Sequence, residues 1–348
     1  MKFCIITDVS LEIPNGIASY VKNLKESFKL TDRDIFNVFE LTNEEISYIN
    51  ENYSFVSLQV GILRSKTADG FKIQKLKKIK LKKIATIHSV VDEEVRLYRE
   101  CMDTYFPTIE YPTNTVHGSS YEKFFLKLVD GLVFSTMKDF NIFKQYYNTP
   151  VRSKIIPPSI DSIQNFNYLS PLKKSKNAAF LGRVDYRKGI LASLNSIEFL
   201  PELNYNIFGP IDTDNQHNKV ILDHFKSKHK NIVYRGTLKD RQNYYDSHFI
   251  FFGNSLYEPF GFAHIENLFN NVVPIVGKET GTHEIFGQDY PFVVEDSVTD
   301  IVSMVKLIYS KDINDIQTIL DKAKDNLRHL TDTFFELNYL DYFNSFSI

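Results

Sequence analysis

The most informative segment of the sequence runs from Asn254 to Glu284 and reads NSLYEPFGFAHIENLFNNVVPIVGKETGTHE. Two glutamates, Glu258 and Glu266, stand eight positions apart in it, and a proline and a glycine lie between them. Because proline and glycine both interrupt helices, one unbroken helix through both glutamates is not expected. We expect instead a loop that carries Glu258 and then a helix of about ten residues that carries Glu266.

The start of this expected helix has the properties of an anion-binding site. The first N–H groups of a helix have no partner within it, and the helix dipole is positive at that end. A phosphate can bind there, and two flanking carboxylates can accept hydrogen bonds from sugar hydroxyls. The alternative is a helix start whose acidic residues only complement the dipole. After the helix we expect a buried strand, Val272 to Val276, and then a turn at Gly281.

The segment EPFGFAHIE, residues 258–266, resembles the E-x7-E signature of retaining glycosyltransferases with the GT-B fold. These are the family 4-like enzymes, or glycosyl transferases group 1. The resemblance implies that Glu258 contacts the donor sugar and that Glu266 binds the ribose of the nucleotide. It also places four residues between them at the donor: Pro259, Phe260, Gly261 and Phe262.

Length and composition agree with a two-domain enzyme. The chain has 348 residues, of which 43% are apolar, enough for two sizeable cores. A net charge of -2 and a pI of about 6.5 argue against a strongly electrostatic nucleic-acid binder. Two cysteines do not make a disulfide framework. No signal peptide or membrane-spanning run is visible, so we expect a cytoplasmic location, with the inner face of the membrane as an open alternative.

The N-terminal half alternates short apolar runs with helical stretches, which predicts a parallel sheet. A first strand, Lys2 to Thr7, is followed by a loop and a helix from Ile17 to Phe28, as in a Rossmann-like unit. The glycosyltransferases often have paired glycines in this loop near the donor phosphate, and only Gly16 matches them. A simple turn is the alternative. Further elements are expected at Ile35–Phe39, Phe55–Val60, Ile84–Ile87, Asp130–Ser135 (strands) and Lys138–Tyr147 (helix).

His88 is a candidate site residue because it ends the expected strand IATIH. At the carboxyl edge of a parallel sheet, a polar residue faces the ligand crevice. A lone histidine is more often structural. Thr86 to His88, however, resembles the T-x-H segment of the glycosyltransferases, which implies that His88 lies beside the donor sugar. Ser89 stands where these enzymes often have an aspartate.

The expected second domain opens with NAAFLGRVDYRKGI, residues 177–190. A strand runs into Gly182 and Arg183, and Lys188 follows five residues later. A fixed guanidinium fork and a mobile ammonium on one loop suit a diphosphate. The motif resembles G-R-x4-K-G, which implies that Arg183 and Lys188 neutralise the leaving nucleotide diphosphate. A surface loop with salt bridges is the alternative.

Later segments extend this second domain. Strands are expected at Tyr205–Phe208, Ile232–Arg235 and Phe249–Phe252, and helices at Val298–Tyr309 and Ile313–Leu327. Tyr234 and Arg235 resemble the segment that lies against the nucleotide base. In the last stretch, Thr333 and Glu336 fit a capping box. Four apolar residues can share one face of that helix: Phe334, Leu337, Leu340 and Phe343.

Two polar stretches have weaker meanings. Seven of the twelve residues from Lys72 to Lys83 are lysines. They could face an anionic membrane, or they could be a solvated helix. Asp212 to Asp214 has the D-x-D spacing of metal-dependent glycosyltransferases, but it lies in a polar loop. GT-B enzymes generally replace the metal with basic residues and a helix dipole, so we expect no metal and no other cofactor.

Together these observations predict an α/β chain with the GT-B fold, two Rossmann-like domains facing a central cleft. The N-terminal domain spans residues 1–157, with a helix of about 333–348 packed back on it, and residues 158–332 bind the nucleotide sugar. Pro157 and Pro158 in KIIPPSID resemble the segment that ends the first domain.

The predicted activity is retaining hexosyl transfer from a nucleotide-diphosphate sugar, and a UDP-sugar is the first choice of donor. The acceptor would be a hydroxyl on a glycan, a lipid or a protein-linked sugar. The residues expected to act in catalysis are Glu258, His88, Arg183 and Lys188. The same chemistry on a modified DNA base and a non-catalytic GT-B partner subunit are the alternatives. A glycoside hydrolase has no diphosphate to neutralise, which disfavours it.

Overall fold

The computed structural model describes residues 2–12, 16–59, 61, 75–105, 123–164, 170–211, 222–223, 225–295 and 297–346. The chain divides into two compact units. The first comprises Met1–Arg96, Thr108–Asp161 and Leu330–Ile348, and the second comprises Leu97–Pro107 and Ser162–His329. The sequence placed the boundaries at residues 157 and 332 and assigned all of 97–107 to the first domain.

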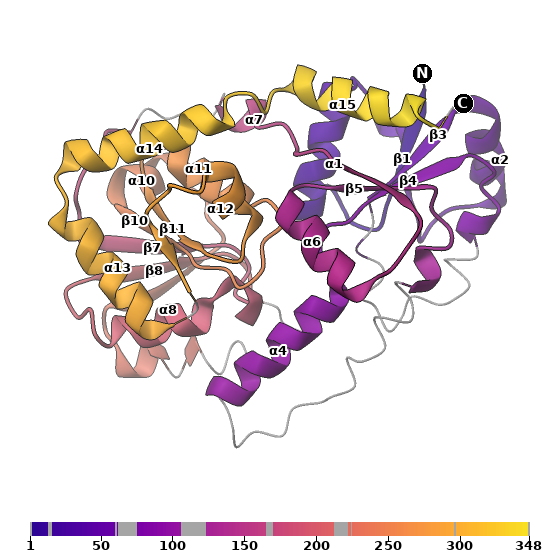
Figure 1. Cartoon of the computed structure of the whole chain (residues 1–348). Coiled ribbons are helices and arrows are strands. Elements are labelled where there is room, and N and C mark those ends of the chain that lie inside the picture. Colours follow the sequence, from indigo (N-terminus) through magenta and orange to yellow (C-terminus); the bar gives the residue numbers. More distant parts are fainter. Residues whose placement is uncertain are drawn as a thin grey trace. The chain divides into compact units, whose positions relative to one another are not determined.

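The first unit is built on a six-stranded sheet with the order β2-β1-β3-β4-β5-β6 (Figure 1). All neighbouring strands are parallel. In chain order they are β1 (Phe3–Thr7), β2 (Ile35–Asn37), β3 (Phe55–Gln59), β4 (Lys82–Thr86), β5 (Gly131–Phe134) and β6 (Arg152–Ile155). Strands β1, β3 and β5 are buried along their whole length, as expected for continuous apolar runs inside a parallel sheet.

The helices of this unit connect the strands in the Rossmann manner. They are α1 (Gly16–Ser27), α2 (Asn43–Asn52), α4 (Val91–Tyr105), α6 (Met137–Tyr146), the short α7 (Asp161–Gln164) and the C-terminal α15 (Asp332–Asn344), with a 3-10 turn η1 (Asp32–Asp34). Helix α4 continues into the segment that belongs to the second unit, and α7 lies at its boundary. The strands that the sequence predicted from apolar runs appear in the predicted order. Their first and last residues differ from the predicted ones by at most two positions.

Helix α15 packs on the first unit, but two details predicted for it are wrong. Its N-cap is Thr331, whose hydroxyl accepts from the Phe334 N–H at 3.2 Å, so Thr333 and Glu336 form no capping box. Its buried side is Phe335, Tyr339, Tyr342 and Phe343, so only Phe343 of the four predicted residues belongs to it, and Leu337 is 60% exposed. The tyrosines decide the buried side because their rings are apolar and their hydroxyls find partners inside.

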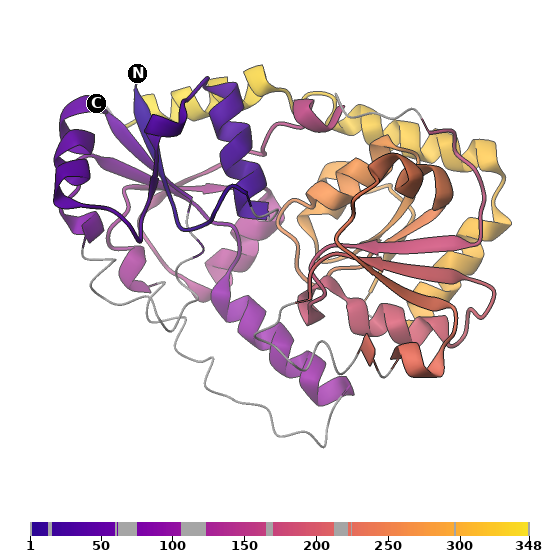
Figure 2. The ribbon, with the colours of Figure 1, turned by 180° about the vertical axis from the view of Figure 1, so that it is seen from behind.

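This buried side of α15 completes the core of the first unit. Phe335, Tyr339 and Phe343 lie in one cluster with side chains of β1, β3 and α1. The rings of Phe343 and Phe55 stack with centroids 5.3 Å apart. A segment from the end of the chain thus covers the sheet that the beginning of the chain forms (Figure 2).

The second unit has its own six-stranded parallel sheet with the order β12-β11-β10-β7-β8-β9. In chain order the strands are β7 (Asn177–Leu181), β8 (Asn204–Phe208), β9 (Ile232–Gly236), β10 (Ile250–Gly253), β11 (Val273–Gly277) and β12 (Val293–Val294). Counted from β7, this is the order 3-2-1-4-5-6 of dinucleotide-binding sheets. The two parallel sheets with their connecting helices confirm the predicted α/β class.

Helices cover the second sheet. They are η4 (Tyr186–Lys188), α8 (Ile190–Ile197), α10 (Arg241–Ser247), α11 (Phe262–Phe269), α12 (Gly281–Phe286), α13 (Val298–Ser310) and α14 (Ile313–Leu327). Helix α8 packs with α13, and α14 packs with α11 and α12. Figure 1 shows these two groups on opposite faces of the sheet. The turn predicted at Gly281 is instead the first residue of α12, which Thr280 caps by accepting from the His283 N–H.

Candidate functional site

The second sheet reverses its direction of growth between β7 and β10. Strands β7, β8 and β9 follow one another toward one edge, and β10, β11 and β12 follow toward the other. In open parallel sheets, ligands bind at the carboxyl ends of the strands at such a switch point. The segment after β7 carries Arg183 and Lys188, and the segment after β10 carries Glu258. Strand order therefore brings these predicted site residues together.

Arg183 has a carboxylate partner on its own loop. Its Nε and Nη2 donate to Asp185 Oδ2 at 3.1 and 2.7 Å, and the Arg183 side chain is 43% exposed. The other oxygen of Asp185 accepts from the Arg187 N–H at 2.9 Å and caps η4. Burial acts to raise the pKa of Asp185, but the charges of Arg187 and Arg183 hold it below its usual value. Asp185 therefore stays ionised and fixes the guanidinium.

Lys188 and Glu258 form the centre of the site. The Lys188 ammonium donates directly to Glu258 Oε2, and the two side chains are only 23% and 16% exposed. Burial alone would raise the pKa of Glu258, but the charge of Lys188 and its hydrogen bond hold it below its usual value. The structure thus joins the G-R-x4-K-G segment and the E-x7-E segment through one largely buried ion pair.

Asn254 holds the two segments in register next to this pair. Its amide nitrogen donates to the Gly189 carbonyl oxygen at 3.0 Å, and its amide oxygen accepts from the Ser193 hydroxyl at 2.7 Å. The Leu256 N–H donates to the Arg187 carbonyl oxygen at 2.9 Å. Because these bonds join two segments that are more than 60 residues apart in the sequence, Lys188 and Glu258 meet without relying on their own attraction alone.

Helix α11 begins directly beyond Glu258. Gly261 is its N-cap, and the Glu258 carbonyl oxygen accepts from the Gly281 N–H at 2.7 Å. The Thr282 hydroxyl donates to the Phe260 carbonyl oxygen at 3.0 Å. These bonds fix the EPFG loop against α12. The positive end of the α11 dipole therefore lies within the same loop as the Lys188–Glu258 pair.

The structure adds His264, which the sequence did not single out. It lies in the first turn of α11 and is 3% exposed, and its Nε2 lies 2.6 Å from the Gly253 carbonyl oxygen. Burial lowers the pKa of His264, so it is neutral near pH 7 and Nε2 carries the proton. Its Nδ1 has no hydrogen-bond partner within the described ranges. Its place between the two glutamates was the signal available in the sequence.

Glu266 lies on α11 and is held from α10. Arg241 Nη1 lies 3.3 Å from Glu266 Oε2, and the Tyr245 hydroxyl donates to the same oxygen at 3.4 Å. Burial raises the pKa of Glu266, and the charge of Arg241 offsets this only in part. The Glu266 side chain is 23% exposed. Neither Arg241 nor Tyr245 was predicted, because nothing in their own segment marks them.

Replacing Glu266 by glutamine is expected to raise the free energy of unfolding at pH 7. A glutamate whose pKa is raised in the folded state costs stability as the pH rises above its unfolded value, and glutamine removes that cost. The difference between variant and wild type should vanish as the pH falls below about 4, where glutamate is protonated in both states. Urea unfolding at pH 7 and at pH 4 measures it. A variant less stable than the wild type at pH 7 would contradict the expectation.

Tyr234 and Arg235 lie on β9, an edge strand that β8 separates from β7. The Tyr234 hydroxyl donates to the Gly209 carbonyl oxygen at 2.9 Å, and Arg235 Nε donates to Asn206 Oδ1 at 2.9 Å. Both contacts are within this part of the sheet. No hydrogen bond or ion pair described for these two residues joins them to Arg183, Lys188 or Glu258.

In the first unit, His88 follows β4 as predicted, and it is partly buried. Its Nε2 lies 2.8 Å from Gln59 Oε1. The hydroxyl of the next residue, Ser89, is buried and has no hydrogen-bond partner within the described part of the chain. Gly16 is the first residue of α1 and is exposed, and no other group lies within 4 Å of the position a Cβ would take.

The two polar stretches are only partly described. Asp212 to Asp214 and Lys72 to Gln74 lie outside the described residues. From Lys75 on, a single helical turn precedes β4, so no long basic helix forms there. Its lysines contact other groups: Lys75 the Leu41 carbonyl, Lys77 the Phe124 ring, Lys78 Asn43, Lys82 Asp130, and Lys83 the Ile79 and Leu81 carbonyls. These contacts lend no support to a membrane-binding face.

Two kinds of feature are absent from the described ranges. There, no three His, Cys, Asp or Glu side chains are grouped so that they could hold a metal ion. No helix among them has the length and apolarity needed to cross a bilayer.

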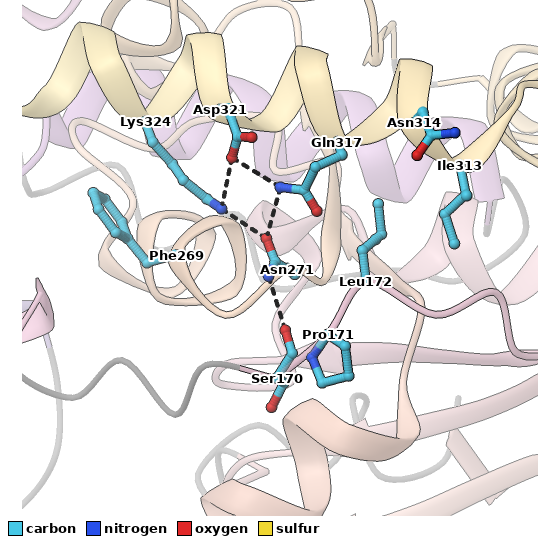
Figure 3. A pocket seen from close by; sticks show the side chains of 10 residues that line it. All are labelled: Ser170, Pro171, Leu172, Phe269, Asn271, Ile313, Asn314, Gln317, Asp321 and Lys324. Carbon is cyan, nitrogen blue, oxygen red and sulfur yellow. Dashed lines mark hydrogen bonds and ion pairs between the residues drawn. The ribbon is translucent and has the colours of Figure 1, made fainter.

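A cavity of about 480 Å³ lies in the second unit away from the predicted residues (Figure 3). It is lined by Ser170 to Leu172, Phe269, Asn271 and one side of α14, including Gln317, Asp321 and Lys324. Lys324 Nζ and Gln317 Nε2 both donate to Asn271 Oδ1, at 2.7 and 3.3 Å, and both also contact Asp321. These polar groups form hydrogen bonds with one another. We therefore interpret the residues that line the cavity as structural contacts between α14 and the turn after α11.

Residues 163–324 match the family model of the glycosyl transferases group 1. This part of the chain is therefore similar to the glycosyl transferases group 1. The matched range contains Arg183, Lys188, Glu258 and Glu266, and so it spans the whole site of the second unit. No curated protein gave a significant sequence match to the chain.

Solved structures extend the similarity beyond the matched range. HepE from Anabaena in complex with UDP and glucose has 10% identity and a TM-score of 0.71, covering 98% of this chain and 99% of that one. Sucrose-phosphate synthase from Thermosynechococcus elongatus has 12% identity and a TM-score of 0.72 over 100% of both chains. A UDP-forming trehalose-phosphate synthase from Burkholderia xenovorans has 10% identity and a TM-score of 0.60, covering 94% and 77%. At these identities the likeness shows the fold, which is GT-B as predicted.

Proposed function

We propose that this protein is a retaining glycosyltransferase that moves a hexose from a nucleotide-diphosphate sugar to a hydroxyl acceptor on a glycan, a lipid or a protein-linked sugar. The observation that carries the proposal is the Lys188–Glu258 ion pair in the loop that leads into α11, with Arg183 on the adjoining segment. The two cations, Arg183 and Lys188, and the start of α11 together suit a diphosphate. The ionised carboxylate of Glu258 suits a sugar.

A UDP-sugar is the first choice of donor. Among the structurally similar proteins, HepE is described in complexes with UDP and with UDP-glucose, and the Burkholderia enzyme is described as UDP-forming. A sugar acceptor is also consistent with that enzyme's complex with glucose-6-phosphate. Contacts of Tyr234 and Arg235 with the base are part of the proposal.

The proposed chemistry is electrostatic. Arg183 and Lys188 each have a carboxylate partner, and a diphosphate would compete with Asp185 and Glu258 for them. As the bond to the sugar breaks, negative charge grows on the diphosphate, and preorganised cations and the α11 dipole stabilise that charge more than they stabilise the bound donor. The acceptor hydroxyl would attack from the same face of the sugar and lose its proton to a phosphate oxygen.

The two glutamates have different roles in this proposal. Glu258 is ionised, and when Lys188 turns to the diphosphate its oxygens can accept hydrogen bonds from sugar hydroxyls. Glu266 lies on α11 with Arg241 and Tyr245 and would accept from the ribose hydroxyls. His88 would lie beside the donor sugar. We assign no covalent nucleophile and no metal.

A thermal-shift panel with UDP, GDP, ADP and their common sugar conjugates tests the proposal. A ligand at 100 times its dissociation constant should add about 2.7 kcal/mol to the free energy of unfolding. We expect UDP and a UDP-sugar to stabilise the wild type but neither Arg183→Ala nor Glu266→Ala. If no nucleotide shifts the melting temperature, the proposed donor site is refuted and a non-catalytic partner subunit is favoured.

A further inference from the structure

A buried chain of side chains leads from His88 into the core of the first unit. Gln59, the last residue of β3, is fully buried, and its Oε1 lies 2.8 Å from His88 Nε2. The Gln59 amide nitrogen donates to Ser57 Oγ at 2.9 Å and to Thr86 Oγ1 at 2.8 Å. Because β3 and β4 pair in parallel with Leu58 opposite Ala85, Gln59 and Thr86 are adjacent across the sheet.

This network of hydrogen-bonded side chains continues into two helices. Thr86 Oγ1 lies 3.0 Å from the Tyr339 hydroxyl of α15, and that hydroxyl lies 2.9 Å from the Tyr20 hydroxyl of α1. Burial raises the pKa of Tyr339 to about 12, so its hydroxyl keeps its proton. The Tyr20 and His88 rings make a T-shaped contact, with centroids 5.1 Å apart and planes at 80°. Gln59 and Tyr20 thus both contact the His88 ring.

The network decides which nitrogen of His88 carries the proton. Both hydrogens of the Gln59 amide are used by Ser57 and Thr86, which leaves its carbonyl oxygen, an acceptor only, toward His88. His88 Nε2 must therefore donate. In the neutral ring the lone pair is then on Nδ1, the nitrogen that can accept a hydrogen bond from a hydroxyl.

We propose that Gln59 is a positioning residue that fixes the tautomer and ring orientation of His88, with Tyr339 of α15 holding Gln59 through Thr86. The inference rests on the proposed function, in which His88 lies beside the donor sugar. In metal sites, removing a side chain that orients a ligand histidine typically lowers metal affinity or activity by about 10–100-fold, and we expect a loss of activity of similar size here. The helix at the end of the chain would then act on the site and not only on stability.

Nitrogen NMR of the histidine rings tests the geometry in the ligand-free protein. Above its pKa, His88 should show a protonated Nε2 and an unprotonated Nδ1. Gln59→Glu keeps an acceptor in place but adds a negative charge, which should raise the pKa of His88 by about 1–2 units. A wild-type His88 protonated at Nδ1, or an unchanged pKa in Gln59→Glu, would overturn the proposal.

Kinetics test the role, with a matched pair of variants on α15. The Tyr339 hydroxyl belongs to the network, whereas the Tyr342 hydroxyl donates to the Arg152 carbonyl oxygen and accepts from the Leu132 N–H. The rate of UDP release from UDP-glucose should fall about tenfold in Gln59→Leu and severalfold in Tyr339→Phe, with KM within twofold, and stay near the wild type in Tyr342→Phe. Equal rates in Tyr339→Phe and Tyr342→Phe, or an unchanged rate in Gln59→Leu, would refute the role.

The two experiments separate this proposal from the proposed function. If the wild type neither binds UDP nor turns over UDP-glucose, the proposed function fails, and the NMR result still decides whether Gln59 sets the state of His88. If the wild type is active and Gln59→Leu is equally active, the function stands and the positioning role is refuted.

Discussion

Replacing Lys188 by methionine is expected to lower the rate of donor turnover by about 10²–10³-fold and the free energy of unfolding by about 2–3 kcal/mol at pH 7. The first effect follows from the loss of a cation aimed at the leaving diphosphate. The second follows because Glu258 would keep its charge in a site where only 16% of its side chain is exposed. Fully buried pairs lose more, about 3–5 kcal/mol, but both of these side chains retain some contact with water.

The pH dependence of this variant has a fixed sign. The pKa of Glu258 is lower in the folded protein than its ordinary value of 4.5, so the ionised carboxylate contributes stability above that pH. This stability is lost as the pH falls through the folded pKa. The difference between wild type and Lys188→Met should therefore be complete at pH 7 and shrink below about pH 4.5.

Two controls isolate the pair. Lys278→Met removes a lysine from an exposed ion pair with Glu295 and should change stability by less than about 1 kcal/mol. The double variant Lys188→Met/Glu258→Gln should regain much of the lost stability, because no unpaired charge remains, but none of the activity. Urea unfolding and turnover of UDP-glucose measure both. Together with the single variant Glu258→Gln, these variants form a double-mutant cycle. A coupling energy near zero between Lys188 and Glu258 in that cycle would show that the pair does not stabilise the loop.

Replacing Gly189 by alanine is expected to lower the free energy of unfolding by about 3–5 kcal/mol. Gly189 has φ +69, and an added Cβ would lie 2.1 Å from the Asn254 carbonyl oxygen and 2.5 Å from its side-chain nitrogen. The obstacle includes backbone, so it cannot move aside as a flexible side chain would. Relief would have to separate the Lys188 segment from the Glu258 segment, and activity should fall with stability.

Gly236 is the matched control for this variant because it has the same φ of +69 and no group within 4 Å of the added Cβ. Gly236→Ala therefore measures the backbone strain alone, about 1–2 kcal/mol. The difference between the two variants is the cost of the close approach. Equal losses in urea unfolding would mean that the contact with Asn254 is not as tight as the structure has it.

The sequence alone predicted the strands well for a physical reason. A strand inside a parallel sheet is buried on both faces, so it appears as a short continuous apolar run, such as FCIIT in β1 or NAAFL in β7. The GT-B fold and the similarity to the glycosyl transferases group 1 could be expected from local motifs, because the motif residues lie on the segments directly after such strands. Glu258, Arg183 and Lys188 could be named in this way.

Only the tertiary structure decided which groups these residues meet. Lys188 meets Glu258 because β7 and β10 are neighbours in the sheet order, and a single sequence does not state that order. The same holds for Arg241 beside Glu266.

The C-terminal helix shows the limit most clearly. Of the four residues predicted for its buried face, only Phe343 is buried. Tyrosines can serve as core residues when their hydroxyls are bonded, and Tyr339 bonds to Thr86 and Tyr20, which are both distant from it in sequence. Local pattern determines which segments become strands and helices and which loops bear charge. Long-range packing determines how each charge and each hydroxyl is paired, because those pairs form only when the sheet has been assembled.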